Sequence, residues 1–316
     1  MNKFKKLKSF IFTSATILFI IHLFNKLVFF IAGAKELLYS RNSNFYQWRF
    51  GKVFYTKQGK GSPLLLIHDL SHISSEIEWK LLVDDLSKKH TVYTIDLIGC
   101  GRSEKPEMTY TSFLYVQLLN DFIKNVIKSK TNVVASGFSS SIVIMACNMD
   151  SSLYQKIFLI NPTDMNQLKK CPHTRDKLMK YVIHTPIIGT LIYNIFSSKT
   201  MIRKAFENEY FYNEHKIRDR FIDCYYEAAH LNGSSSKYLF ASNFSNYTNC
   251  NITHALKSIN NSIFIAIGDQ VDNYNNIIDE YVEINPSIET SVINNTKGLP
   301  HLEKPKSILS LFDMFF

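Results

Sequence analysis

The residues best suited to chemistry lie at 131–142, where a short apolar strand pattern leads into Gly137-x-Ser139-x-Ser141 and then a helical pattern. A serine on a tight strand-to-helix turn can present its hydroxyl as a nucleophile. Such a turn needs small residues two positions before and two positions after the serine, because their side chains face each other across it. Gly137 and Ser141 meet that need, so we expect Ser139 to be a nucleophile. The alternative for so short a motif is a purely structural turn.

The elements around this segment alternate between short apolar strands and amphipathic helices. We expect a hairpin over 45–55, strands over 64–67, 91–95, 132–135, 157–160, 262–267 and 288–293, and helices over 78–87, 111–127, 141–148, 274–282 and 306–316. This alternation predicts an α/β fold with a mostly parallel sheet covered on both faces. Residues 162–258 are helical and aromatic without a strand pattern, so we expect an inserted helical lid there.

Polar segments follow most of the expected strands. In a parallel sheet, ligands bind outside the carboxyl ends of the strands, so we expect a site where these segments meet. They are His68-Asp69-Leu70, residues 96–103, Ser136 to Ser139, Asn161 to Asp164, Gly268 to Asp272 and residues 297–305.

The order and spacing of these segments resemble the α/β-hydrolase fold family in its lid-bearing branch, over about residues 45–316. Two of them carry most of the resemblance: Asp96-x-x-Gly99-x-Gly101-x-Ser103 and Leu299-Pro-His-Leu-Glu-Lys-Pro305. The resemblance implies a serine hydrolase acting on an ester, amide or similar bond, with the chain order serine, acid, histidine. It implies a catalytic set of Ser139, Asp272 and His301, with Asp164 and Asp269 as alternative acids and an oxyanion hole from the backbone N–H groups of Leu70 and Ser140.

Two positions depart from the family pattern. Gly298 stands where the family usually has its catalytic histidine, and Asp69 stands where a glycine commonly precedes the oxyanion loop. Glycine cannot accept a proton, so His301, three residues further on, would have to act as the base. A carboxylate beside a developing oxyanion raises the barrier unless it is paired, and we expect Arg102 to pair with Asp69.

These observations support two hypotheses. The first is a membrane-tethered serine hydrolase that cleaves a small lipophilic ester or acyl substrate through an acyl-enzyme. The second is a catalytically impaired protein with the hydrolase fold that acts as a membrane-associated binding or scaffold protein, because position 298 is glycine.

The N-terminal segment predicts the membrane association. Four lysines at positions 3–8 precede an apolar stretch at 10–31 that Lys26 alone interrupts with a charge. About 20 predominantly apolar residues span a bilayer. We therefore expect a single-pass anchor, and the lysines favour a cytoplasmic N-terminus with the hydrolase domain on the outer face. A cleaved signal peptide and a helix lying in the interface are the alternatives.

Charge and composition narrow the remaining function classes. The net charge is +9, but residues 1–41 contribute +6 of it, and no basic stripe is interleaved with aromatic residues, so we expect no nucleic-acid partner. Five scattered cysteines without a CxxC pair, and no HExxH motif, predict no metal and no cofactor. The chain then divides into an anchor (1–41), a first core half (42–161), the lid (162–258) and a second core half (259–316).

Overall fold

The computed structural model of this chain describes residues 2–40 and 42–316, with the side chains of residues 4–40 and 42–316. Arg41 and the side chain of Lys3, which the charge count of the N-terminal segment includes, lie outside the described residues.

One eight-stranded sheet forms the centre of the domain, with strand order β1-β2-β4-β3-β5-β6-β7-β8. The strands are β1 (Asn44–Trp48), β2 (Gly51–Gln58), β3 (Ser62–Ile67), β4 (His90–Ile95), β5 (Thr131–Ser136), β6 (Tyr154–Ile160), β7 (Ser262–Gly268) and β8 (Glu289–Ile293). β2 pairs antiparallel with β1 and β4, and every other pair is parallel. The mostly parallel sheet expected from the sequence is confirmed.

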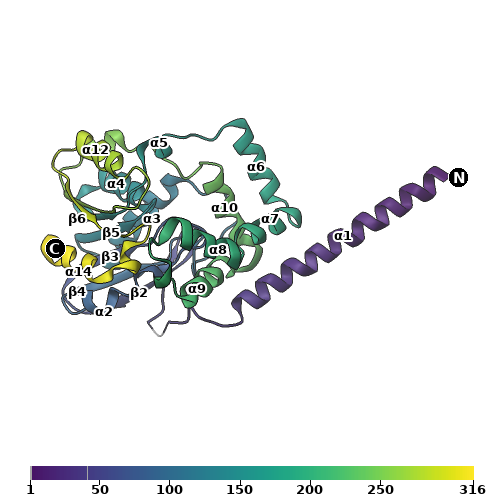
Figure 1. Cartoon of the computed structure of the whole chain (residues 1–316), viewed down its shortest axis with the longest axis horizontal. Helices are drawn as coiled ribbons and strands as arrows, with labels where there is room; N and C mark the ends of the chain where they lie inside the picture. The colour runs from purple at the N-terminus through teal and green to yellow at the C-terminus, as the bar shows by residue number, and fades with distance from the viewer. Residues whose placement is uncertain (1, 41) are drawn as a thin grey trace.

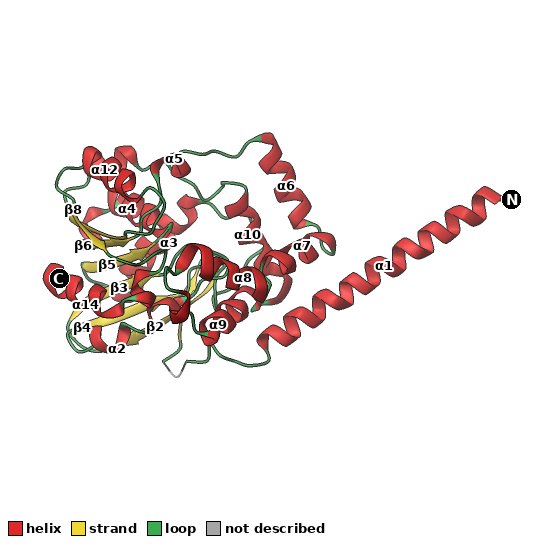
Figure 2. Cartoon of the chain, in the orientation of Figure 1, coloured by secondary structure: helices red, strands yellow, loops and turns green. Residues whose placement is uncertain are grey.

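Helices cover both faces of this sheet (Figure 2). The helices that follow strands in the two core halves are α2 (Val83–Leu86), α3 (Ser112–Phe122), α4 (Ser139–Met149), α12 (Tyr274–Ile284), α13 (Pro300–Glu303) and α14 (Pro305–Phe315). The helix expected over 78–87 is divided into a 3-10 turn, η1 (Glu76–Trp79), and the short α2. The helix expected over 111–127 ends as a π-helical turn, η2 (Ile123–Ile127).

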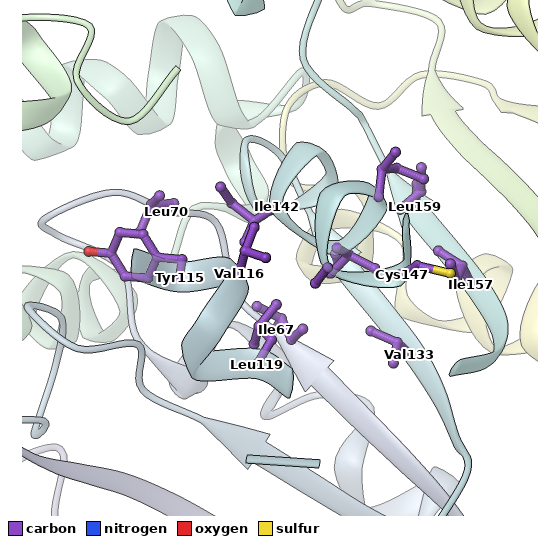
Figure 3. Packing of buried hydrophobic residues seen from close by; sticks show 14 of the residues in the cluster. Ile67, Leu70, Tyr115, Val116, Leu119, Val133, Ile142, Cys147, Ile157 and Leu159 are labelled. Atoms are coloured by element: carbon purple, nitrogen blue, oxygen red, sulfur yellow. The ribbon is translucent and has the colours of Figure 1, made fainter. Parts of the chain in front are cut away.

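The central strands are apolar on both sides because each side packs against helices. Leu65, Ile67, Val133 and Ile157 face one way, into a core shared with α3, α4 and α12. Figure 3 shows Ile142 and Cys147 of α4 and Tyr115, Val116 and Leu119 of α3 packing over Ile67, Val133 and Ile157. Their neighbours Leu64, Leu66, Val134 and Phe158 face the other way, against α2 and α14. This packing fixes α4, and with it the turn that precedes α4, relative to the strand ends.

A helical insertion lies between β6 and β7; here the name means residues 165–258. It contains α5 (Met165–Leu168), α6 (Thr174–His184), α7 (Ile188–Phe196), α8 (Lys199–Ala205), η4 (Phe206–Tyr210), η5 (Glu214–Lys216), α9 (Asp219–His230), η6 (Gly233–Ser236), α10 (Lys237–Phe244) and α11 (Thr253–Ser258). No strand interrupts it, in agreement with the sequence pattern.

The N-terminal helix α1 (Asn2–Gly33) is the one helix in the described residues that is long and apolar enough to cross a membrane. Its first half projects away from the domain, as Figure 1 shows, and its second half packs against α7 and α9 of the helical insertion. Asn25 is buried at this contact, where its Nδ2 donates to the Ile187 carbonyl (3.0 Å) and its Oδ1 accepts from Asn194 Nδ2 (2.9 Å).

Candidate active site at the carboxyl ends of the strands

A cavity of about 420 Å³, here called the strand-end pocket, lies at the carboxyl ends of the parallel strands. Its walls come from the segments that follow β3, β5, β6, β7 and β8, together with the η4 turn of the helical insertion. The lining residues that the argument below uses are Asp69, Gly137, Phe138, Thr163, Asp164, Glu209, Asp272 and Gly298. The sequence therefore predicted correctly which edge of the sheet carries the pocket.

The turn between β5 and α4 consists of Gly137 and Phe138, because β5 continues to Ser136 and α4 begins at Ser139. Gly137 adopts the left-handed backbone region, with φ of 55°, whereas Phe138 has φ of −64°. In the α/β-hydrolase family that the sequence resembles, the nucleophile sits on the strained residue of that turn. Gly137 occupies this place, and a Cβ on it would lie 2.5 Å from Asp69 Oδ1.

The carboxylate of Asp69 occupies the place of a substrate oxyanion. It accepts a hydrogen bond from the Phe138 backbone N–H (2.8 Å) and another from the Leu70 N–H. In this fold the oxyanion hole is made by the N–H of the residue after the nucleophile and by an N–H from the loop after the first buried strand. Phe138 and Leu70 supply those two N–H groups, and the carboxylate of Asp69 accepts from both.

The charge of Asp69 is poorly accommodated at neutral pH. Burial raises the pKa of its carboxyl to about 7, and the nearby Glu78 carboxylate adds to this effect. The hydrogen bonds from Phe138 and Leu70 work in the opposite direction, because they favour the ionised form. A carboxyl group that loses its proton near pH 7 and borders a cavity can donate or accept a proton there.

Ser139 does not reach the strand-end pocket. It is the first residue of α4, it is fully buried, and its Oγ donates to the His68 carbonyl at 2.6 Å. The expectation that Ser139 is the exposed residue of the turn is therefore corrected, because the strand ends later, at Ser136, and the helix starts earlier, at Ser139, than the motif implied. The hydroxyl of Ser139 ties α4 to the loop after β3.

The second oxyanion donor is also corrected. The backbone N–H of Ser140 donates to the Gly137 carbonyl at 3.2 Å, inside the turn, so it is not free to hold an oxyanion. Leu70 supplies an N–H at the expected place, and Phe138 supplies the other.

His301 is fully buried and does not line the strand-end pocket. Its Nε2 is 3.1 Å from Glu78 Oε1, and its ring stacks on Trp79 with ring centroids 4.7 Å apart. No histidine lines the strand-end pocket in the described part of the chain. The structure thus does not bring His301 to the cavity, and it leaves Ser139 and Asp272 without a shared imidazole.

Position 298, where the family pattern places its histidine, does border the pocket but has no room for a side chain. A Cβ on Gly298 would lie 2.5 Å from the Glu209 carbonyl oxygen. The reason is that η4 of the helical insertion runs alongside: the N–H groups of Gly298 and Leu299 donate to the carbonyls of Glu209 and Tyr210, both at 3.0 Å. The carboxylate of Glu303 adds two bonds, from the N–H groups of Tyr212 and Asn213. The helical insertion is therefore fastened to this loop.

Of the three candidate acids, Asp272 and Asp164 line the strand-end pocket. Asp164 also caps α5, where its Oδ1 accepts from the Asn166 N–H at 2.6 Å. Asp269 instead accepts from the Thr296 N–H at 3.3 Å. Across the described residues, no cluster of three or more His, Cys, Asp and Glu side chains could hold a metal ion.

The pair formed by Glu78 and His301 is a buried feature that the sequence reasoning missed. Burial alone would raise the pKa of Glu78, but the 3.1 Å contact with His301, aided by His68, holds this pKa below its ordinary value. The ionised Glu78 is one cause of the raised pKa of Asp69.

Arg102, expected to pair with Asp69, instead contacts Asp96 (2.8 Å) and Glu76 (2.9 Å). Asp69 therefore has no cationic side chain to neutralise it among the described ion pairs.

Comparison with known proteins agrees with this architecture. A family model described as alpha/beta hydrolase fold matches residues 62–188. Over 108 residues the chain is 28% identical to the 2-hydroxy-6-oxo-6-(2'-aminophenyl)hexa-2,4-dienoic acid hydrolase of Metapseudomonas resinovorans, a match that covers 34% of this chain and 37% of that enzyme. The sequence matches span less than two fifths of the length of the curated relatives.

Solved structures cover more of the chain. The epoxide hydrolase CorEH superposes with a TM-score of 0.71 and 17% identity, over 87% of this chain and 98% of that one. The naproxen esterase of Bacillus subtilis superposes with a TM-score of 0.66 and 16% identity, over 92% and 98%. The chain has the α/β-hydrolase fold, as its sequence pattern indicated, and these similar proteins are hydrolases.

Proposed function

We propose that this protein is tethered to a membrane by α1 and binds a small ligand in the strand-end pocket without the acyl-enzyme chemistry of a serine hydrolase. The observation that carries the proposal is the combination at the turn: Gly137 stands in the nucleophile's place, and the carboxylate of Asp69 holds the N–H groups of Phe138 and Leu70. A substrate oxyanion would have to displace that carboxylate and its negative charge.

The lining of the strand-end pocket supports a small ligand that carries a carbonyl group. Apolar side chains, among them Phe138, Val271 and Leu299, would cover its hydrocarbon part. Below pH 7 the protonated Asp69 can donate a hydrogen bond to the carbonyl oxygen, as a carboxylic acid kept neutral by an apolar site can. This ligand class includes the small lipophilic esters and acyl compounds expected from the sequence.

Ligand-detected NMR tests the binding role. A panel of small esters and amides, including 4-nitrophenyl butyrate and N-phenylbutanamide, is mixed with the full chain in detergent micelles. We expect saturation transfer to at least one compound, and its loss in Thr163→Phe, which places a bulky ring at a lining position outside the loop that carries Asp69. The matched control is Val292→Phe, on an exposed position of β8. Transfer that is absent, or that survives Thr163→Phe, contradicts the proposal.

A second candidate is hydrolysis that depends on Asp69 as a general acid or base. The pKa of about 7 favours it, because proton transfer is most effective when the pKa lies near the working pH. The similar proteins are also hydrolases. The rate of 4-nitrophenyl butyrate hydrolysis, measured between pH 5 and 9, tests this candidate. If Asp69 is the acid or base, the rate should change around pH 7. This change should disappear in Asp69→Asn and persist in Ser139→Ala.

Membrane tethering rests on α1, whose apolar side chains are exposed over most of its length. The lysines at its start favour a cytoplasmic N-terminus and a domain on the outer face. The helical insertion acts as a fixed cover of the pocket, because η4 is bonded to the loop at Gly298.

A further inference from the structure

A second cavity, of about 440 Å³, lies between α1 and the helical insertion. We call it the anchor pocket. Its polar lining comes from His22, Asn25 and Lys26 of α1, and from Glu107, His184 and Lys237 of the domain. Two lysines, two histidines and one glutamate thus line the cavity. The strand-end pocket shares none of these residues.

Lys237 is the unusual member of this set. It is 3% exposed, and its ammonium donates to the Thr185 carbonyl (2.8 Å) and to Thr190 Oγ1 (3.2 Å). An ammonium has three donors, so one remains. No carboxylate forms an ion pair with Lys237 in the described part of the chain, although buried charges in proteins are normally paired. Burial lowers the pKa of Lys237, and the negative charge of Glu107 offsets this only in part. An anion in the anchor pocket would supply the missing counter-charge.

The position of the anchor pocket along α1 indicates that the anion would come from the membrane surface. Asn25 fixes the second half of α1 on the helical insertion through its bonds to Ile187 and Asn194. A membrane span of about 20 residues that starts after Lys8 ends near Val28. The pocket-lining residues of α1 lie at positions 22–29. They therefore lie in the last two turns of the span and just beyond it, beside the region where the polar headgroups of lipids begin.

We propose that the anchor pocket binds the phosphate of a phospholipid headgroup, with Lys237 and Lys26 as its cationic contacts. The proposal rests on the membrane tether proposed above. Basic pockets beside transmembrane helices bind phospholipid headgroups in this way, and lysine contacts phosphate as a point charge. The acyl chains would lie along the exposed apolar face of α1, next to Phe29 at the wall of the pocket.

Binding of short-chain lipids to the full chain in dodecyl maltoside tests the proposal. Isothermal titration compares dioctanoyl-phosphatidylglycerol with dioctanoylglycerol, which has the same chains and no phosphate. We expect the phosphate-bearing lipid to bind at least ten-fold more tightly. In Lys237→Met this preference should fall about ten-fold, the loss typical of one charged hydrogen bond. Lys306→Met, at an exposed position of α14, is the matched control and should bind as the parent does.

Three results would overturn the proposal. Equal affinity for the two lipids would show that the phosphate is not recognised. Unchanged affinity in Lys237→Met would show that the lipid does not bind in the anchor pocket. If glycerol 3-phosphate or inorganic phosphate binds as tightly as the lipid, the ligand is a free phosphate and not a phospholipid. If Lys237→Met does not fold, Lys26→Met gives the same test from the exposed wall, where the preference should fall by several fold. Alkaline carbonate extraction of cell membranes tests the tether separately, so that its failure is distinguishable from failure of the lipid site.

Discussion

Substitution of Asp69 by asparagine should change how the stability of the protein depends on pH. The carboxyl of Asp69 has its pKa raised from 3.8 to about 7, because it is buried and lies near Glu78. Between these two values the folded state holds a proton that the unfolded state has released. The stabilisation from this proton is complete below about pH 4 and is lost as the pH rises through about 7.

The shift sets the magnitude. One pKa unit corresponds to about 1.36 kcal/mol, so ionising Asp69 lowers the free energy of unfolding by about 4 kcal/mol between pH 4 and pH 8. Asparagine keeps the acceptor for the Phe138 and Leu70 N–H groups but does not ionise. The difference in the free energy of unfolding between Asp69→Asn and the parent should therefore change by about 4 kcal/mol in favour of the variant from pH 4 to pH 8.

Urea denaturation of the full chain in detergent, at half-unit steps from pH 4 to pH 8, measures this difference. The exposed Asp279→Asn provides the matched control, and its curve should run parallel to that of the parent. Parallel curves for Asp69→Asn as well would refute the reasoning, because they would mean that Asp69 ionises as freely in the folded protein as in the unfolded chain.

Three further predictions concern the turn, the buried pair and the anchor helix. Gly137→Ala should lower the free energy of unfolding by about 3 kcal/mol or more, since its Cβ meets Asp69 Oδ1 at 2.5 Å; Gly233→Ala shares a positive φ but meets nothing within 4 Å, so urea denaturation should show a smaller loss. Glu78→Gln should cost about 1–3 kcal/mol by the same measurement, because it removes the ionised partner in the buried contact with His301; an unchanged free energy of unfolding would exclude that pairing. Asn25→Leu should speed amide hydrogen exchange in α7 at least ten-fold, because the bonds to Ile187 and Asn194 are lost; unchanged exchange would mean that α1 does not hold α7 in place.

The architecture was predictable from the sequence because its signals are local. Apolar runs as short as residues 64–67 and 157–160 are typical of strands buried on both faces, and the polar segments after such strands meet at one edge of a parallel sheet. The helical insertion was equally visible as a long stretch without a strand pattern. The helix expected at 78–87 was wrong as one continuous element, because residues 80–82 form a turn between η1 and α2.

The details of the site depended on register, which the sequence pattern left ambiguous. The rule of small residues on both sides of the turn fits Ser139, flanked by Gly137 and Ser141, but it fits Gly137 equally well, flanked by Ala135 and Ser139. Only the end of β5 at Ser136 decides between them. The proximity of Glu78 to His301 joins residues more than 200 positions apart, so no local pattern could reveal it. Gly298 and Asp69 were the sequence signals that suggested an altered site, and both border the strand-end pocket.

Intact-protein mass spectrometry after treatment with a fluorophosphonate tests most directly whether this turn presents a nucleophile. With Gly137 at the strained position and the hydroxyl of Ser139 bonded to the His68 carbonyl, we predict no covalent adduct under conditions that label an active esterase of this fold to completion. A stoichiometric adduct that maps to Ser139 and disappears in Ser139→Ala would contradict the account.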